Sequence, residues 1–186
     1  DLRRYGQALL YRQPKVRAET ILLVSRTVPI LLTVALTLLV GFWARARFGP
    51  GAGLLAAVLA ALEPNLAAHG HIVTTDLPAT VTVFLACVAF ERMLRRRTWL
   101  DVVWLGLALG AAFSSKFSTV FLAPSFLIVC AMTRRAGLDA LLKTASAGVL
   151  ALLVLMTSYG PATLRVNPSP WADEALRVDA GLVARV

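Results

Sequence analysis

The chain has 186 residues, of which 58% are hydrophobic and only 16% are charged, and its net charge is +9. A soluble domain carries about 25% charged residues, so this composition and the long apolar runs exclude a soluble globular protein and indicate an integral membrane protein. Basic residues cluster between the apolar runs without interleaved aromatic residues, so we expect membrane lipids and no nucleic acid as partners. Cys87 and Cys130 lie inside apolar runs and are predicted to be buried small side chains rather than a disulfide.

The first half of the chain predicts two helices that cross a membrane. Residues 1–20 mix basic and apolar side chains, which is typical of an amphipathic segment at the interface, with a solvated loop as the alternative. An uncharged run predicts the first crossing helix over about residues 22–44. The next uncharged run, 51–62, is too short to cross alone, so the second helix is predicted to continue, kinked at Pro64, towards His69.

The second half predicts the remaining crossings. A third helix is expected over about residues 77–90, followed by an arginine cluster. Residues 99–133 would form a helix of roughly 52 Å, which exceeds the hydrocarbon core of about 30 Å. We therefore expect two short helices in a hairpin with Lys116 at its tip. The last helix is predicted over 141–159, before a mixed polar tail. The fold class is thus an all-α polytopic transmembrane bundle of about six membrane-crossing helices, including the short hairpin.

Charge in the loops predicts the orientation of this bundle. Successive loops of the predicted bundle lie on alternate sides of the membrane. The loops on one side hold nine basic residues and those on the other hold four, so the positive-inside rule places the first side in the cytoplasm. Residues 1–26 carry six further basic residues on the opposite side, which makes the totals ten and nine. The short internal loops are the more reliable reporters, and by them the polar stretch 62–78 faces the outside.

The stretch 62–78 is the polar centre of the chain. It places both histidines, Glu63 and Asp76 between two apolar runs. Ionisable groups near a bilayer are costly and mark a site by default, with a polar inter-helix loop as the alternative. Thr74, Thr75 and Asp76 directly precede an apolar helix, so one of them is expected to be its N-cap.

A family resemblance rests on this stretch. The segment joining the third and fourth spans of GT-C membrane glycosyltransferases, in the protein O-mannosyltransferase and aminoarabinose-transferase-like branch, resembles Glu63-Pro64-Asn65-Leu66-Ala67-Ala68-His69-Gly70 and Val73-Thr74-Thr75-Asp76-Leu77-Pro78. Weaker matches in the same order are Ser25-Arg26-Thr27-Val28-Pro29, Trp43-Ala44-Arg45 with Phe48-Gly49, and Ser115-Lys116-Phe117-Ser118. The resemblance implies a partial GT-C transmembrane domain over residues 1–160, with 161–186 as the start of an extracytoplasmic loop.

The resemblance also implies an activity and a location. The protein would transfer a sugar from a polyprenyl-phosphate donor to a protein, lipid or glycan acceptor on the extracytoplasmic face of a membrane, which we expect to be the bacterial inner (plasma) membrane. Members of this fold carry an acidic residue in the first outer loop, which would precede Asp1 together with the first span. A fragment that begins at Asp1 is therefore expected to be inactive alone.

Site residues follow from the resemblance and from the chemistry of glycosyl transfer, which needs a base for the acceptor and cations for the departing phosphate. Asp76 is the expected catalytic carboxylate, with helix capping as a further role. Lys116 is a candidate phosphate ligand, and interfacial snorkelling is its alternative. The expected substrate-binding residues are Lys116, Arg26, His69, His71 and Thr75.

A metal cofactor and a different function class are the rival interpretations. His69 and His71 are two residues apart and point in different directions on a helix, so we expect no metal, and a divalent ion held with Glu63 and Asp76 is the less favoured alternative. The rival function is a proton- or ion-coupled transporter or flippase, in which the same four side chains form an ion path.

Overall fold

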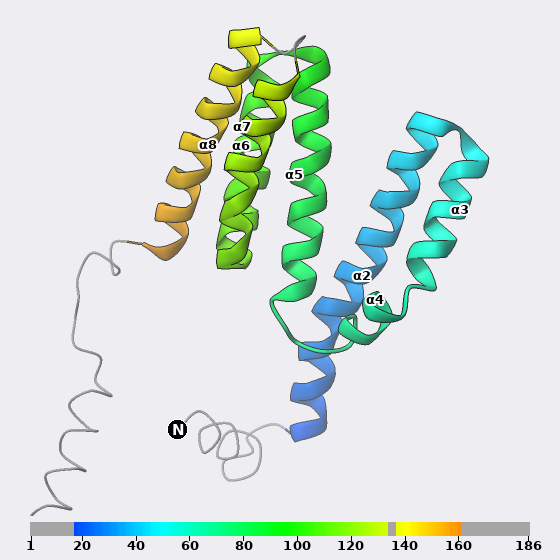
Figure 1. Cartoon of the computed structure of the whole chain (residues 1–186). Coiled ribbons are helices and arrows are strands. Elements are labelled where there is room, and N and C mark those ends of the chain that lie inside the picture. Colours follow the sequence, from blue (N-terminus) through cyan, green and yellow to red (C-terminus); the bar gives the residue numbers. More distant parts are fainter. Residues whose placement is uncertain (1–16, 134–136, 161–186) are drawn as a thin grey trace, which may run out of the picture.

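The computed structural model describes residues 17–133 and 137–160, and all regular structure in these ranges is helical (Figure 1), as predicted. The elements in chain order are α2 (Ala18–Phe48), α3 (Pro50–Ala61), α4 (Pro64–His69), α5 (Asp76–Arg96), α6 (Trp99–Ser115), the 3-10 helix η2 (Phe117–Phe121), α7 (Leu122–Met132) and α8 (Gly137–Tyr159). Most of the amphipathic segment expected over residues 1–20, and the tail 161–186, lie outside the described residues.

Three described helices are long and apolar enough to cross a membrane: α2, α5 and α8. The other apolar helices are shorter: α3, α6 and the continuous η2–α7 segment. The long helices extend a few residues beyond their predicted limits because charged side chains form their last turns, such as Arg45 and Arg47 in α2. Six crossings therefore remain a prediction, whereas the all-helical bundle is confirmed.

The prediction of one helix kinked at Pro64 is wrong, because the helix is interrupted before this residue. Helix α3 ends at Ala61, and α4 starts anew at Pro64 as its first residue. Proline suits the first turn of a helix, where its missing N–H is not needed. The result is a short separate helix, α4, that carries His69 at its end.

The hairpin expected over residues 99–133 is confirmed. Helix α6 ends at Ser115, Lys116 adopts an extended conformation, η2 packs against α6, and α7 runs back and packs against α8. Helix α8 packs against α6 so closely that a Cβ at Gly106 would lie 2.7 Å from Leu150 Cδ2. The larger hydrophobic core forms among α5, α6, α7 and α8.

A smaller core joins α2 to α5 through Leu36, Leu77 and Val81. Helix α3 packs against the other side of α2, where Gly41 and Gly53 bring the two backbones together. Small residues permit this approach, as expected for helices in lipid.

The bundle has two chemically different ends. Arg47 contacts Glu91, and Lys143 Nζ donates to the carbonyl of Arg97 at 2.7 Å, so the end of α2, the end of α5 and the start of α8 lie together. At the opposite end, Ser114 Oγ lies 3.3 Å from Ser158 Oγ. Figure 1 shows the same alternation of helix directions. The two sets of loops proposed from charge thus occupy opposite ends of the described bundle.

The two cysteines are free, but only one is buried. Cys130 is buried, with its Sγ 3.3 Å from Thr144 Oγ1. Cys87 is exposed on α5, so its predicted burial is wrong. In a membrane an apolar exterior faces lipid, so an apolar run does not place each of its residues inside the protein.

Candidate functional site

The site centres on Asp76, the first residue of α5. A carboxylate in the first turn is favoured by the positive end of the helix dipole. Thr75 occupies the N-cap position but its side chain makes no capping hydrogen bond, so the capping prediction is correct in place and wrong in mechanism. The carboxylate of Asp76 remains available for contacts outside its own helix.

Lys116 supplies one of those contacts. Its Nζ lies 2.5 Å from Asp76 Oδ1, although the two residues are 40 positions apart. The extended backbone at Lys116, with φ −155° and ψ 130°, ends α6 and turns the chain into η2. Both side chains are almost half exposed, and an exposed ion pair contributes little to stability. The contact therefore matters more for where it holds two charges than for folding.

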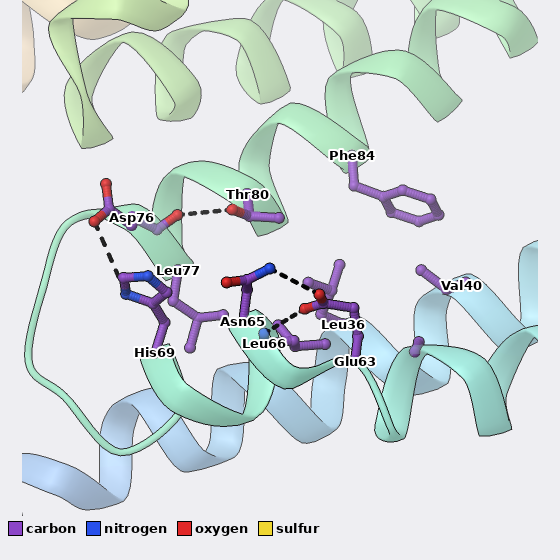
Figure 2. A pocket seen from close by; sticks show the side chains of 11 residues that line it. Leu36, Val40, Glu63, Asn65, Leu66, His69, Asp76, Leu77, Thr80 and Phe84 are labelled. Carbon is purple, nitrogen blue, oxygen red and sulfur yellow. Dashed lines mark hydrogen bonds and ion pairs between the residues drawn. The ribbon is translucent and has the colours of Figure 1, made fainter.

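His69 also lies beside the Asp76 carboxylate, as Figure 2 shows. Its Nδ1 is 4.0 Å from Asp76 Oδ2, and this nitrogen is buried without a hydrogen-bond partner among the described residues. The neighbouring Gly70 is buried against α2, where a Cβ would lie 2.6 Å from Thr33 Oγ1. Close packing of the loop on α2 thus helps to fix the imidazole beside Asp76.

Glu63 has a structural role that the sequence left open. It is the N-cap of α4, and its carboxylate accepts hydrogen bonds from the Leu66 backbone N–H at 2.5 Å and from Asn65 Nδ2 at 2.9 Å. The hydrogen bond from the Leu66 backbone lowers the pKa of Glu63 below its ordinary value, with further lowering by Asn65 and the nearby His69. Glu63 is therefore an anion committed to the start of α4.

A cavity of about 400 Å³ opens beside these residues between α2, α3, α4 and α5. Its polar lining is Glu63, Asn65, His69, Asp76 and Thr80. Its apolar lining comes mainly from Leu36, Val40, Leu77 and Phe84, and Figure 2 shows both groups. The cavity thus has a charged end at the start of α5 and an apolar wall along α2 and α5. An elongated molecule with one polar end matches this arrangement.

The side chains of three other candidate residues form no hydrogen bond or ion pair with Asp76, Lys116 or His69 in the described structure. His71 is exposed, and its Nδ1 lies 3.0 Å from the carbonyl of Ala67. Thr75 is exposed and does not line the cavity. Arg26 is exposed on α2, seven residues before Thr33, which places it on the same helix face about 10 Å further along the axis.

Asn65 and Thr80 are polar lining residues that sequence reasoning missed. Asn65 follows the helix-starting Pro64, and Thr80 lies one turn after Asp76, with its Oγ1 donating to the Asp76 carbonyl at 2.8 Å. The i+4 spacing of Thr80 was the available signal. Within residues 17–133 and 137–160, no group of three His, Cys, Asp or Glu side chains is arranged to hold a metal ion.

Comparison with known proteins gives a family match over most of the chain. The family described as dolichyl-phosphate-mannose-protein mannosyltransferase matches residues 19–159. This range contains all the described helices except the first residue of α2, together with Asp76, Lys116 and His69. No curated protein and no solved structure matches the chain.

Proposed function

Because the chain belongs to the dolichyl-phosphate-mannose-protein mannosyltransferase family, a family of GT-C membrane glycosyltransferases, we propose that it carries part of the site that transfers a sugar from a polyprenyl-phosphate donor. The acceptor is a hydroxyl of a protein, lipid or glycan. The site faces the extracytoplasmic side of the membrane, and the bacterial inner (plasma) membrane is its proposed location. The observation that carries this proposal is the Asp76–Lys116 pair beside a cavity with an apolar wall.

The pair supplies two requirements of the reaction. Transfer breaks the bond between the sugar C1 and the donor phosphate oxygen and forms a bond from C1 to the acceptor oxygen. The acceptor hydroxyl loses a proton, which a carboxylate such as Asp76 can accept, and the departing phosphate carries negative charge. An ammonium has three N–H donors, so Lys116 can keep its contact with Asp76 while it also donates to the phosphate.

The remaining site residues have supporting roles in this proposal. The buried Nδ1 of His69 offers a hydrogen-bonding group beside Asp76 Oδ2, towards the sugar or the acceptor. Arg26, on the cavity-side face of α2, contributes positive charge for the donor phosphate. His71 and Thr75 contact the acceptor from the exposed loop. No metal takes part, since a lysine and an arginine balance the phosphate charge in this scheme.

The placement of the ionisable residues favours sugar transfer over ion transport. An ion path needs ionisable groups that continue from one end of the bundle to the other. Here Glu63, His69, His71 and Asp76 all lie at one end, and the cavity that continues from them along α2 and α5 has apolar walls. Transfer at one face of the membrane requires only one such end.

The decisive experiment replaces Asp76 in the full-length protein in membranes and measures sugar transfer from a polyprenyl-phosphate donor. Asp76→Asn is expected to lower kcat on the order of 10²–10⁴-fold, as for the loss of a general base, while the thermal midpoint changes little. Lys116→Gln is expected to lower kcat and to raise the KM for the donor. Asp139→Asn is the matched control, because Asp139 is also an exposed carboxylate paired with a lysine, Lys143, but lies at the other end.

Two results would contradict the proposal. Wild-type transfer by a folded Asp76→Asn protein would remove Asp76 from the chemistry. An equal loss in Asp139→Asn would show that the assay reports a general charge effect rather than the site.

A further inference from the structure

A second hollow, separate from the Asp76 cavity, lies between α2 and α5 at the arginine end of the bundle. Its volume is about 600 Å³. The two helices pack through Leu36, Leu77 and Val81 near the Asp76 end, and in Figure 1 they are further apart towards the arginine end. An edge-to-face contact of Trp43 with Phe84, with 6.3 Å between the ring centroids, lies between the two hollows, since Trp43 lines this one and Phe84 the other.

The rim of this second hollow is strongly basic. Four arginines line it: Arg47, Arg92, Arg95 and Arg96. Two carboxylates bind members of this set, because Glu91 contacts Arg47 and Arg95, and Asp101 accepts from Arg92 Nε at 2.6 Å. Four positive charges against two negative charges leave an excess of two. The rim therefore attracts anions.

The wall below the rim is apolar. Leu39, Phe42 and Val88 line it, and the exposed fraction of Phe42 is 64%. Leu39 precedes Arg47 by eight residues, and Val88 precedes Arg96 by eight, so on both helices the apolar wall extends to about 12 Å below the furthest arginine. This matched order of apolar and basic groups on two helices corresponds to the acyl chain and headgroup of a lipid.

We propose that this hollow binds an anionic phospholipid, whose phosphate contacts the arginine rim and whose acyl chain lies along Leu39, Phe42 and Val88. Charge complementarity selects an anionic headgroup, and the apolar wall selects a lipid over a soluble anion. Basic pockets between transmembrane helices are suited to such headgroups, and arginine binds phosphate oxygens through paired N–H groups. The bound lipid fills the space that remains between α2 and α5 beside the contacts of Trp43 and Arg47 with Glu91.

Trp43 provides a direct probe of the site. The chain has four tryptophans, and the variant Trp99→Phe, Trp104→Phe and Trp171→Phe keeps only Trp43. The full-length protein is reconstituted in nanodiscs of phosphatidylcholine with increasing phosphatidylglycerol, either of which carries brominated acyl chains that quench indole fluorescence. We expect brominated phosphatidylglycerol to quench Trp43 at a mole fraction at least about fivefold lower than brominated phosphatidylcholine, since each basic residue near a charged surface contributes about that factor.

Two arginine variants separate a specific site from general surface charge. Arg96→Gln removes a rim charge and is expected to lower the preference for phosphatidylglycerol about fivefold. Arg45→Gln is the matched control, because Arg45 is exposed on α2 at the same end but its Cβ faces Gly53 of α3 rather than the hollow. It is expected to keep the preference.

Three outcomes would overturn the proposal: equal quenching by the two brominated lipids, an equal loss of preference in both arginine variants, or displacement of the lipid signal by soluble glycerol phosphate. The last outcome would show a site for free anions. None of these results depends on sugar transfer, so the proposal stands or fails independently of the proposed function.

Discussion

At the arginine end of the bundle, the Asp101 side chain is 1% exposed and accepts hydrogen bonds from Arg92 Nε at 2.6 Å and Thr98 Oγ1 at 2.5 Å. At the other end, the Asp76 side chain is 43% exposed and, among the residues that the structure describes, is hydrogen-bonded to Lys116 alone. Both carboxylates belong to the first turn of a helix. They differ in how much of their hydrogen-bonding capacity the fold already uses.

In the proposed function, that difference separates the structural carboxylate, Asp101, from the catalytic one, Asp76. An ionised carboxylate has about four sites that accept hydrogen bonds, and Asp101 has little room for a new partner because its surroundings are closed. Asp76 keeps acceptor capacity on an open cavity, and beside it lies the buried Nδ1 of His69, which has no hydrogen-bond partner within 17–133 and 137–160. The sequence shows two aspartates at helix starts and does not distinguish them, whereas burial and the number of hydrogen-bond partners do.

The largest effect on stability is expected from Asp101, at the arginine end of the bundle. Asp101→Ala removes a buried carboxylate and is expected to cost about 3 kcal/mol of stability, because the hydrogen bonds that this charged group accepts from Arg92 and Thr98 are lost together. Thermal unfolding in detergent measures the loss, and sugar transfer per folded molecule should stay near the wild-type rate.

Asp139→Ala is the control for Asp101→Ala, since Asp139 is also in the first turn of a helix but is about half exposed. A mutant at Asp101 with the wild-type thermal midpoint and no transfer would reverse the comparison. The arginine end would then hold the chemistry.

A middle-sized effect is expected where the loop before α5 presses on α2. Gly70→Ala places a Cβ 2.6 Å from Thr33 Oγ1 and 3.0 Å from the Leu66 carbonyl, so one of them must move. Overpacking of this kind costs about 1–3 kcal/mol, and the shift passes directly to the adjacent His69. We expect lower transfer as well as a lower thermal midpoint.

The double variant Gly70→Ala with Thr33→Ala tests that cause. Removing the Thr33 hydroxyl opens space for the new methyl group, so part of the transfer and stability should return. Thr33→Ala alone is the control. If the double variant is no better than Gly70→Ala, the contact with α2 does not position the site.

Much of the fold follows from the sequence, because a bilayer restricts a chain to few solutions. Uncharged runs gave the helices, and the length of residues 99–133 required a turn near Lys116. Alternation of helix directions then placed Lys116 and Asp76 at the same end. The direct contact of their side chains depends on how α5 packs against α6, which no local pattern reports.

The missed features share a physical cause. The helix end before Pro64 was missed because the apolar run before it gives no sign of where the helix stops. The cap by Glu63 was missed because glutamate is not among the preferred N-cap residues. The exposure of Cys87 follows from lipid as the surrounding solvent. The sequence therefore predicts a site in the polar stretch, and the structure distinguishes its two acidic residues: Glu63 caps α4, whereas Asp76 contacts Lys116 and lines the cavity.

The smallest effect on stability is expected from Glu63. Unlike Asp76 at the same end of the bundle, it already uses its carboxylate in hydrogen bonds within the described structure. The Leu66 N–H stabilises the charged form, so the pKa of Glu63 in the folded protein is below the ordinary value of 4.5. A lowered pKa contributes stability that is present above pH 4.5 and is lost as the pH falls through the folded pKa. Glu63→Gln should therefore lower the thermal midpoint slightly at pH 6, and the difference from wild type should shrink below pH 4.5. Transfer should change little, because this carboxylate is committed to Leu66 and Asn65. A loss of transfer as large as that of Asp76→Asn, without a change in the thermal midpoint, would place both acidic residues in the chemistry and end the division between them.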